Sequence, residues 1–135
     1  MSRTLLLPTT VVLLLVLGGC GCQQTGYKEL LSPHGNYIAI ERETDCGATE
    51  PYRTAISIRT AQPTLGAHWL GFAAKRVFLA DVVLTDTDVQ WLSDHDLKIT
   101  CSDATCVKYG IVERVNAWRD VKIHFDVGKA KKGEF

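Results

Sequence analysis

Large apolar residues alternate with polar ones along much of the chain, most clearly near its end. In the segment 121–127 every second residue is apolar, and these residues are Val121, Ile123, Phe125 and Val127. A repeat of two residues is typical of a β-strand that buries one face and exposes the other. The segment therefore predicts a strand whose apolar row lies in the core, with Lys122, His124 and Asp126 facing solvent.

Six further segments are predicted as strands because they alternate in the same way or are rich in β-branched residues. They are 37–41, 52–59, 76–84, 89–92, 97–100 and 106–115. No segment shows the repeat of an amphipathic helix over a convincing length. We therefore predict an all-β domain, a small and mainly antiparallel meander folded into a sandwich or a partly open barrel.

The densest cluster of polar chemistry is Asp94, His95 and Asp96, between the segments 89–92 and 97–100. Four residues, 93–96, separate the two strands, which suits the tip of a hairpin. Three neighbouring residues in a turn cannot all point at one ion, so we predict no metal there. The tip is interpreted as a solvated turn or, alternatively, as a recognition loop that acts together with the loop 45–52.

Four cysteines follow Cys20, at positions 22, 46, 101 and 106. Cys101 and Cys106 flank a four-residue loop, so we predict that a disulfide joins them across two facing strand ends. Cys46 is expected to be a buried thiol or the partner of Cys22, in a turn that Asp45 caps and in which Gly47 supplies a conformation closed to other residues. A catalytic Cys46 would need a neighbouring histidine, and the chain has His34, His68, His95 and His124.

The N-terminal segment has the pattern of a secretory signal. Arg3 precedes an apolar run that begins at Leu5, is interrupted by Pro8, and ends in the sequence Leu-Gly-Gly-Cys at residues 17–20. A membrane-spanning helix needs a longer uninterrupted run, of roughly 20 residues. The segment resembles the signal peptide and lipobox of a bacterial prolipoprotein, and this resemblance implies that residues 1–19 are removed and that Cys20 carries acyl chains.

The same resemblance implies that the protein is located in the cell envelope. An aspartate after the modified cysteine commonly signals retention in the inner membrane, whereas this chain has Gly21. In a Gram-negative source the resemblance therefore implies the outer membrane, with the domain facing the periplasm. We expect residues 20–31 to be a lipidated tether, 32–128 a single β domain and 129–135 a basic tail.

Two motifs in the predicted domain resemble a group of small, uncharacterised bacterial exported proteins and lipoproteins. The turn Ser32-Pro33-His34-Gly35 is similar to their Ser-Pro-Asp-Gly turn, with His34 in place of the aspartate, and Asp-Cys-Gly-Ala-Thr follows at 45–49. The resemblance implies a β fold and an exported location. It implies no activity, and no motif in the chain leads us to expect a cofactor.

The composition narrows the function classes further. The chain has 15 basic and 15 acidic side chains, which gives no electrostatic basis for binding nucleic acid. We expect a non-enzymatic binding or envelope-maintenance module whose partners are the membrane, through the acyl chains, and a protein of the envelope. The alternatives are an inhibitor of an envelope enzyme such as lysozyme and a small hydrolase that uses Cys46.

Overall fold

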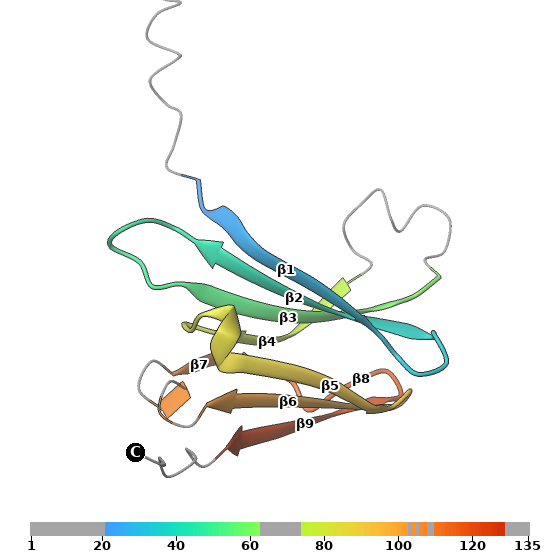
Figure 1. Cartoon of the computed structure of the whole chain (residues 1–135). Coiled ribbons are helices and arrows are strands. Elements are labelled where there is room, and N and C mark those ends of the chain that lie inside the picture. The colour runs from blue at the N-terminus through green and yellow to red at the C-terminus, as the bar shows by residue number, and fades with distance from the viewer. Residues whose placement is uncertain (1–20, 63–73, 103, 105, 108–109, 129–135) are drawn as a thin grey trace, which may run out of the picture.

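The computed structural model describes residues 21–62, 74–102, 104, 106–107 and 110–128. The predicted signal peptide, Cys20 and the basic tail 129–135 lie outside these residues, as does His68. The described chain forms two β-sheets that pack face to face (Figure 1). The all-β prediction is confirmed, and of the two architectures considered the fold is a sandwich.

The larger sheet has five strands in the order β1-β2-β3-β4-β7, and each neighbouring pair is antiparallel. Its strands are β1 (Gln23–Leu31), β2 (Tyr37–Asp45), β3 (Arg53–Thr60), β4 (Ala74–Ala80) and β7 (Ile111–Arg114). The first four follow one another in sequence, so this part of the sheet is the predicted meander.

The smaller sheet has four strands in the order β5-β6-β9-β8. Its strands are β5 (Thr87–Ser93), β6 (Asp96–Ser102), β8 (Ala117–Trp118) and β9 (Val121–Gly128), and a short 3-10 helix (Leu84–Asp86) leads into β5. β6 and β9 are parallel, because the chain crosses to β7 in the larger sheet and returns through β8 before β9 begins. The sandwich is therefore mainly antiparallel with one parallel pair.

The core between the sheets contains the apolar rows that the alternation predicted. Thr54, Ile56, Ile58 and Val121 are fully buried, Ile123 is 5 % exposed, and Phe125 packs against the core. The side chain of Val127 is outside the described part of the structure. The faces of β3 and β9 that pack between the two sheets are therefore the faces that the alternation predicted to be buried.

The prediction of a tether over residues 20–31 is wrong for most of that segment. Gln23–Leu31 is strand β1, which pairs with β2 from Gln23 opposite Asp45 to Leu31 opposite Ile38. Strand pairing uses backbone hydrogen bonds, so an edge strand can form from a polar sequence with little side-chain burial. Most of β1 is exposed, and this explains why the sequence pattern did not reveal it.

One charged side chain lies in the interior of the larger sheet. Glu41 on β2 is 1 % exposed, and its carboxylate lies 3.3 Å from the ammonium of Lys28, its direct neighbour on β1. Burial raises the pKa of Glu41, and the nearby Lys28 opposes that shift. The positive charge of Lys28 on the edge strand therefore compensates part of the cost of burying the negative charge of Glu41.

The disulfide between Cys101 and Cys106 is present as predicted, with 6.1 Å between the two Cα atoms. The two facing strands that were expected to flank this disulfide are not present. Cys106 lies in a helical turn, and the predicted strand 106–115 is reduced to Ile111–Arg114. Gly110 donates its N–H to the carbonyl of Cys106 at 3.0 Å and has a positive φ of 84°, so the turn ends there and the chain can enter β7.

Candidate functional site

The register of β1 and β2 defines two opposite ends of the sandwich. Cys22 and Cys46 lie where β1 begins and β2 ends, and we call this the disulfide end. The turn Ser32–Asn36 lies at the other extremity of the same two strands (Figure 1). A strand of nine residues is about 30 Å long, so the two ends are separated by roughly that distance.

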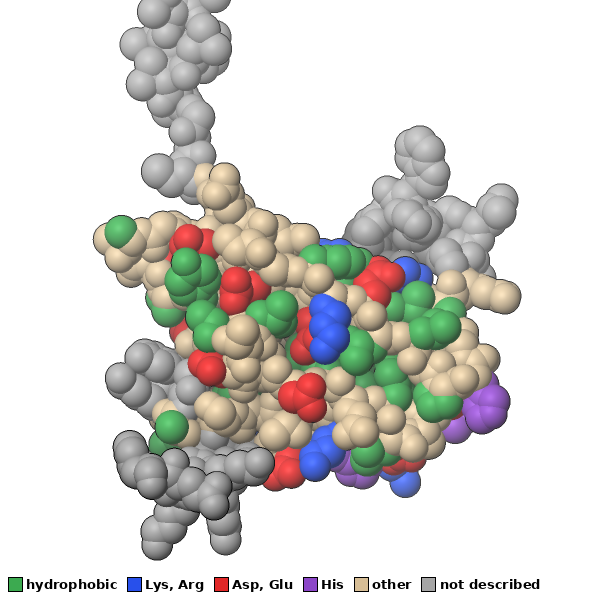
Figure 2. Space-filling model, viewed as in Figure 1, with side chains coloured by type: hydrophobic (Ala, Val, Ile, Leu, Met, Phe, Trp, Pro, Cys, Tyr) green, Lys and Arg blue, Asp and Glu red, His purple; other side chains and the backbone are tan. Residues whose placement is uncertain are grey.

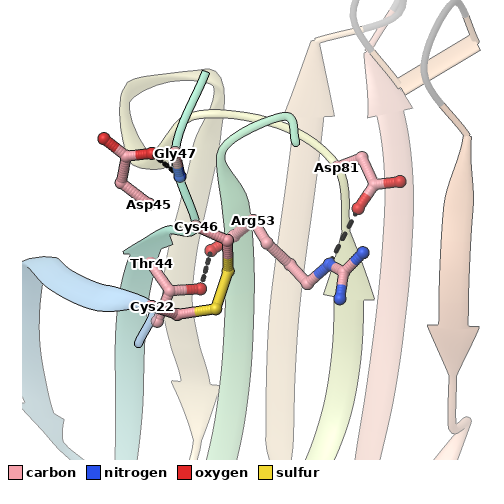
Figure 3. The surroundings of a disulfide bond; sticks show 7 residues. All are labelled: Cys22, Thr44, Asp45, Cys46, Gly47, Arg53 and Asp81. Carbon is pink, nitrogen blue, oxygen red and sulfur yellow. Dashed lines mark hydrogen bonds and ion pairs between the residues drawn. A yellow bond between two sulfur atoms is a disulfide. The ribbon is translucent and has the colours of Figure 1, made fainter. Parts of the chain in front are cut away.

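At the disulfide end, Cys22 is bonded to Cys46 (Figure 3). This confirms one of the two states expected for Cys46 and excludes the other, a buried free thiol. It also removes the nucleophile from the cysteine-hydrolase hypothesis, because a sulfur in a disulfide has no thiolate to attack with. The bond ties the residue that precedes β1 to the loop that follows β2.

Three hydrogen bonds surround this disulfide (Figure 3). The Gly47 N–H donates to Asp45 Oδ1 at 2.9 Å, and Gly47 has a φ of 104°, as predicted for this turn. Thr44 Oγ1 donates to the Arg53 carbonyl at 3.3 Å, and Arg53 Nε donates to Asp81 Oδ1 at 2.9 Å. These bonds fix the positions of the two strand ends next to the disulfide.

At the opposite end, three turns come together, and we call this the turn end. They are Ser32–Asn36 between β1 and β2, Asp94–His95 between β5 and β6, and Arg119–Asp120 between β8 and β9. Figure 2 shows histidine side chains on the surface at this end of the molecule. Sequence reasoning placed only the second of these turns among the candidate sites.

Asp94 links the first two turns. It is only 8 % exposed, and its carboxylate accepts hydrogen bonds from the backbone N–H of His34 at 2.9 Å and from Asn36 Nδ2 at 3.4 Å. His34 Nδ1 lies 2.5 Å from the same carboxylate. The backbone N–H of His34 is the main cause that lowers the pKa of Asp94, with Ser32 and the imidazole of His34 adding to it. The interpretation of Asp94 as a solvated tip residue is therefore wrong.

His95 and Asp120 connect the second turn to the third. His95 Nδ1 lies 2.9 Å from Asp120 Oδ2, and the hydroxyl of Tyr37 donates to Asp120 Oδ1. The Tyr37 hydroxyl is the main cause that lowers the pKa of Asp120, and the same hydrogen bond raises the pKa of Tyr37. One carboxylate thus joins groups from β2 and from the β5–β6 turn.

Asp96 and His124 form a third pair, across the parallel strands β6 and β9. His124 Nε2 lies 2.8 Å from Asp96 Oδ1, and Ser93 Oγ donates to Asp96 Oδ2 at 2.8 Å. His124 is the main cause that lowers the pKa of Asp96, followed by Ser93. Asp96 therefore closes the β5–β6 hairpin and joins it to β9, whereas Asp94 is bonded to His34 and His95 to Asp120.

Aromatic rings pack beneath these polar pairs. The ring of Tyr37 lies 6.3 Å from that of Trp91 in a stacked arrangement and 6.0 Å from that of Trp118 in an edge arrangement. Trp91 Nε1 donates to the carbonyl of Leu30 at 2.9 Å, which links β5 of the smaller sheet to β1 of the larger one. The turn end is therefore fixed by rings from both sheets.

The polar side chains of the turn end bond to one another and hold the three turns in place. Each described imidazole is paired with an aspartate, and no hydrogen bond found in the described ranges joins an imidazole to a hydroxyl or thiol. Within the same ranges, no group of three or more histidine, cysteine, aspartate or glutamate side chains could hold a metal ion. What the arrangement offers is a rigid surface built from three loops.

Sequence reasoning missed His34, Tyr37 and Asp120 as members of this site. The available signal for His34 was its position in a turn motif that otherwise carries aspartate. For Tyr37 and Asp120 there was no local signal, because they are 83 residues apart and meet only in the folded sandwich.

No helix of the described segments is both long enough and apolar enough to cross a membrane. No protein-family model, curated protein or solved structure matches the chain.

Proposed function

We propose that the protein is a lipid-anchored lipoprotein of the bacterial envelope whose β-sandwich is a binding module. Acyl chains on Cys20 would hold it at the membrane, and several chains give the stable attachment that a single chain does not. In a Gram-negative cell the domain would face the periplasm from the outer membrane. The partner would be a component of the envelope that meets the turn end.

The observation that carries this proposal is the position of the Cys22–Cys46 disulfide. Only Gly21 separates Cys20 from Cys22, and Cys22 is bonded to the loop after β2. An anchor on Cys20 would therefore keep the disulfide end at the membrane surface. The turn end would then lie roughly 30 Å away, in the aqueous space.

Two further features support an exported binding module. The described chain holds two disulfides, which are compatible with an oxidising compartment. The turn end presents loops on a rigid scaffold, which is where recognition residues concentrate in sandwich domains.

The experiment that tests the proposal is fractionation of cells that make either wild type or Cys20→Ala, grown with a labelled fatty acid. Wild type should carry the label and remain in the membrane pellet after a high-salt wash. Cys20→Ala should lose the label and appear in the soluble fraction with both disulfides formed. If Cys20→Ala stays in the washed pellet, the anchor is not a lipid on Cys20.

A further inference from the structure

Arg119 has an unusual backbone conformation in the turn between β8 and β9. Trp118 pairs with Val121, so Arg119 and Asp120 are the two central residues of this hairpin turn. The φ of Arg119 is 54°, the only positive φ of a non-glycine residue in the described chain. Glycine or asparagine is the usual choice for such a position, because a larger side chain is strained there. Strain of this kind often marks a residue whose side chain is needed for function.

The side chain of Arg119 lies on the surface of the protein and is not part of its core. Arg119 is exposed, and its guanidinium carbon lies 4.8 Å from the centre of the Trp118 ring. Across the described ranges, no ion pair and no hydrogen bond of its guanidinium is found. The aspartates of the turn end have other partners: Asp94 is bonded to His34, Asp96 to His124, and Asp120 to Tyr37 and His95.

We propose that Arg119 binds a carboxylate of an external ligand at the turn end. A guanidinium presents its N–H groups as a planar fork that matches the two oxygens of a carboxylate. Contact with the Trp118 ring restricts the side chain before binding, which lowers the entropic cost of association. The carboxylate of the neighbouring Asp120 is bonded to Tyr37 and His95, and among the described residues no ion pair joins it to Arg119.

The class of ligand rests on the proposed function. If the disulfide end is at the membrane, the turn end faces a space that contains the cell-wall polymer of glycan and peptide. Free carboxylates are part of that polymer's chemistry. The inference is therefore that the sandwich touches the wall through Arg119 while the lipid holds its other end at the membrane.

The test is co-sedimentation of the detergent-solubilised, acylated protein with purified cell-wall sacculi at low salt. Arg119→Gly is the informative variant, because glycine accepts a φ of 54° and so removes the guanidinium without straining the turn. Arg42→Ala is the matched control, because Arg42 is also exposed and also lies over an aromatic ring, 5.5 Å from the centre of Tyr27, but on β2 away from the turn end. Thermal unfolding of each variant reports whether the fold is retained.

We expect wild type and Arg42→Ala to sediment alike and Arg119→Gly to bind about tenfold more weakly, which is the effect of losing one charge-assisted contact. Sacculi whose carboxylates have been converted to amides, with their phosphates untouched, should bind wild type no better than they bind Arg119→Gly. The proposal is overturned if wild type does not sediment, if Arg119→Gly binds as wild type does, or if the amidated sacculi still bind. Because this assay uses no membrane, its outcome is independent of the fractionation result for Cys20→Ala.

Discussion

The carboxylate of Asp94 accepts hydrogen bonds from His34, a residue 60 positions earlier in the chain. This contact joins the β1–β2 turn of one sheet to the β5–β6 turn of the other. The sequence pattern indicated only that the hairpin tip is polar. The structure shows instead that Asp94 in this tip contacts a residue that is distant in the sequence. The turn end owes its fixed geometry to contacts of this type.

Replacing Asp94 by alanine should destabilise the sandwich, because it leaves the backbone N–H of His34 and the amide of Asn36 without their acceptor. We expect the midpoint of thermal unfolding to fall by several degrees. The control is Asp126→Ala, which removes only a surface pair with Lys98 at 2.9 Å and should have almost no effect. Equal midpoints for the two variants would mean that the contact with His34 does not stabilise the fold.

The same contact should depend on pH in a defined direction. The pKa of Asp94 is lowered in the folded protein from an ordinary value of 3.8, so the folded state favours its ionised form. Its contribution to stability is complete above that ordinary value and is lost as the pH falls through the lowered one. Urea titrations at several pH values should therefore show the difference between wild type and Asp94→Ala shrinking below about pH 4.

Glu41 should show the opposite behaviour. Burial raises its pKa above the ordinary 4.5, so the folded state favours the protonated form. Stability should therefore fall as the pH rises from the ordinary pKa through the raised one. Glu41→Gln keeps the shape of the side chain without the charge and should lose this part of the pH dependence. A variant whose urea midpoints follow those of wild type across that range would show that Lys28 fully compensates the buried charge.

The two disulfides should differ in how much they stabilise the fold, because they close loops of different length. The cysteines are 24 residues apart in Cys22–Cys46 and 5 apart in Cys101–Cys106. The chain-entropy model gives about 3.5 kcal/mol for the longer loop and about 2 kcal/mol for the shorter one. Urea unfolding of the two double serine variants measures both values. The reverse order of stabilities would contradict this account.

The parts of the fold that the sequence predicts are those with a local pattern. The alternation in 121–127 places Val121 and Ile123 correctly in the core, and Cys101 and Cys106 are close enough in sequence to indicate their own bond. β1 has no such pattern, because an edge strand is held by its backbone and exposes most of its side chains.

The site was harder to predict than the fold. Cys46 had several possible partners, and only the pairing of β1 with β2 brings Cys22 to it. His34 and Asp94 meet because two different sheets end at the same place. Contacts of this kind depend on the arrangement of the sheets, which no single segment of the sequence encodes.

The proposed function places the disulfide end at the membrane and the turn end away from it. The most direct measurement uses the acylated protein in liposomes that carry a quencher on the lipid head groups. A fluorescent amino acid replaces either Glu50, exposed in the loop after Cys46, or Leu92, 54 % exposed next to the β5–β6 turn. Strong quenching at position 50 and almost none at position 92 is the predicted result. Equal quenching at both positions, or stronger quenching at position 92, would contradict the account.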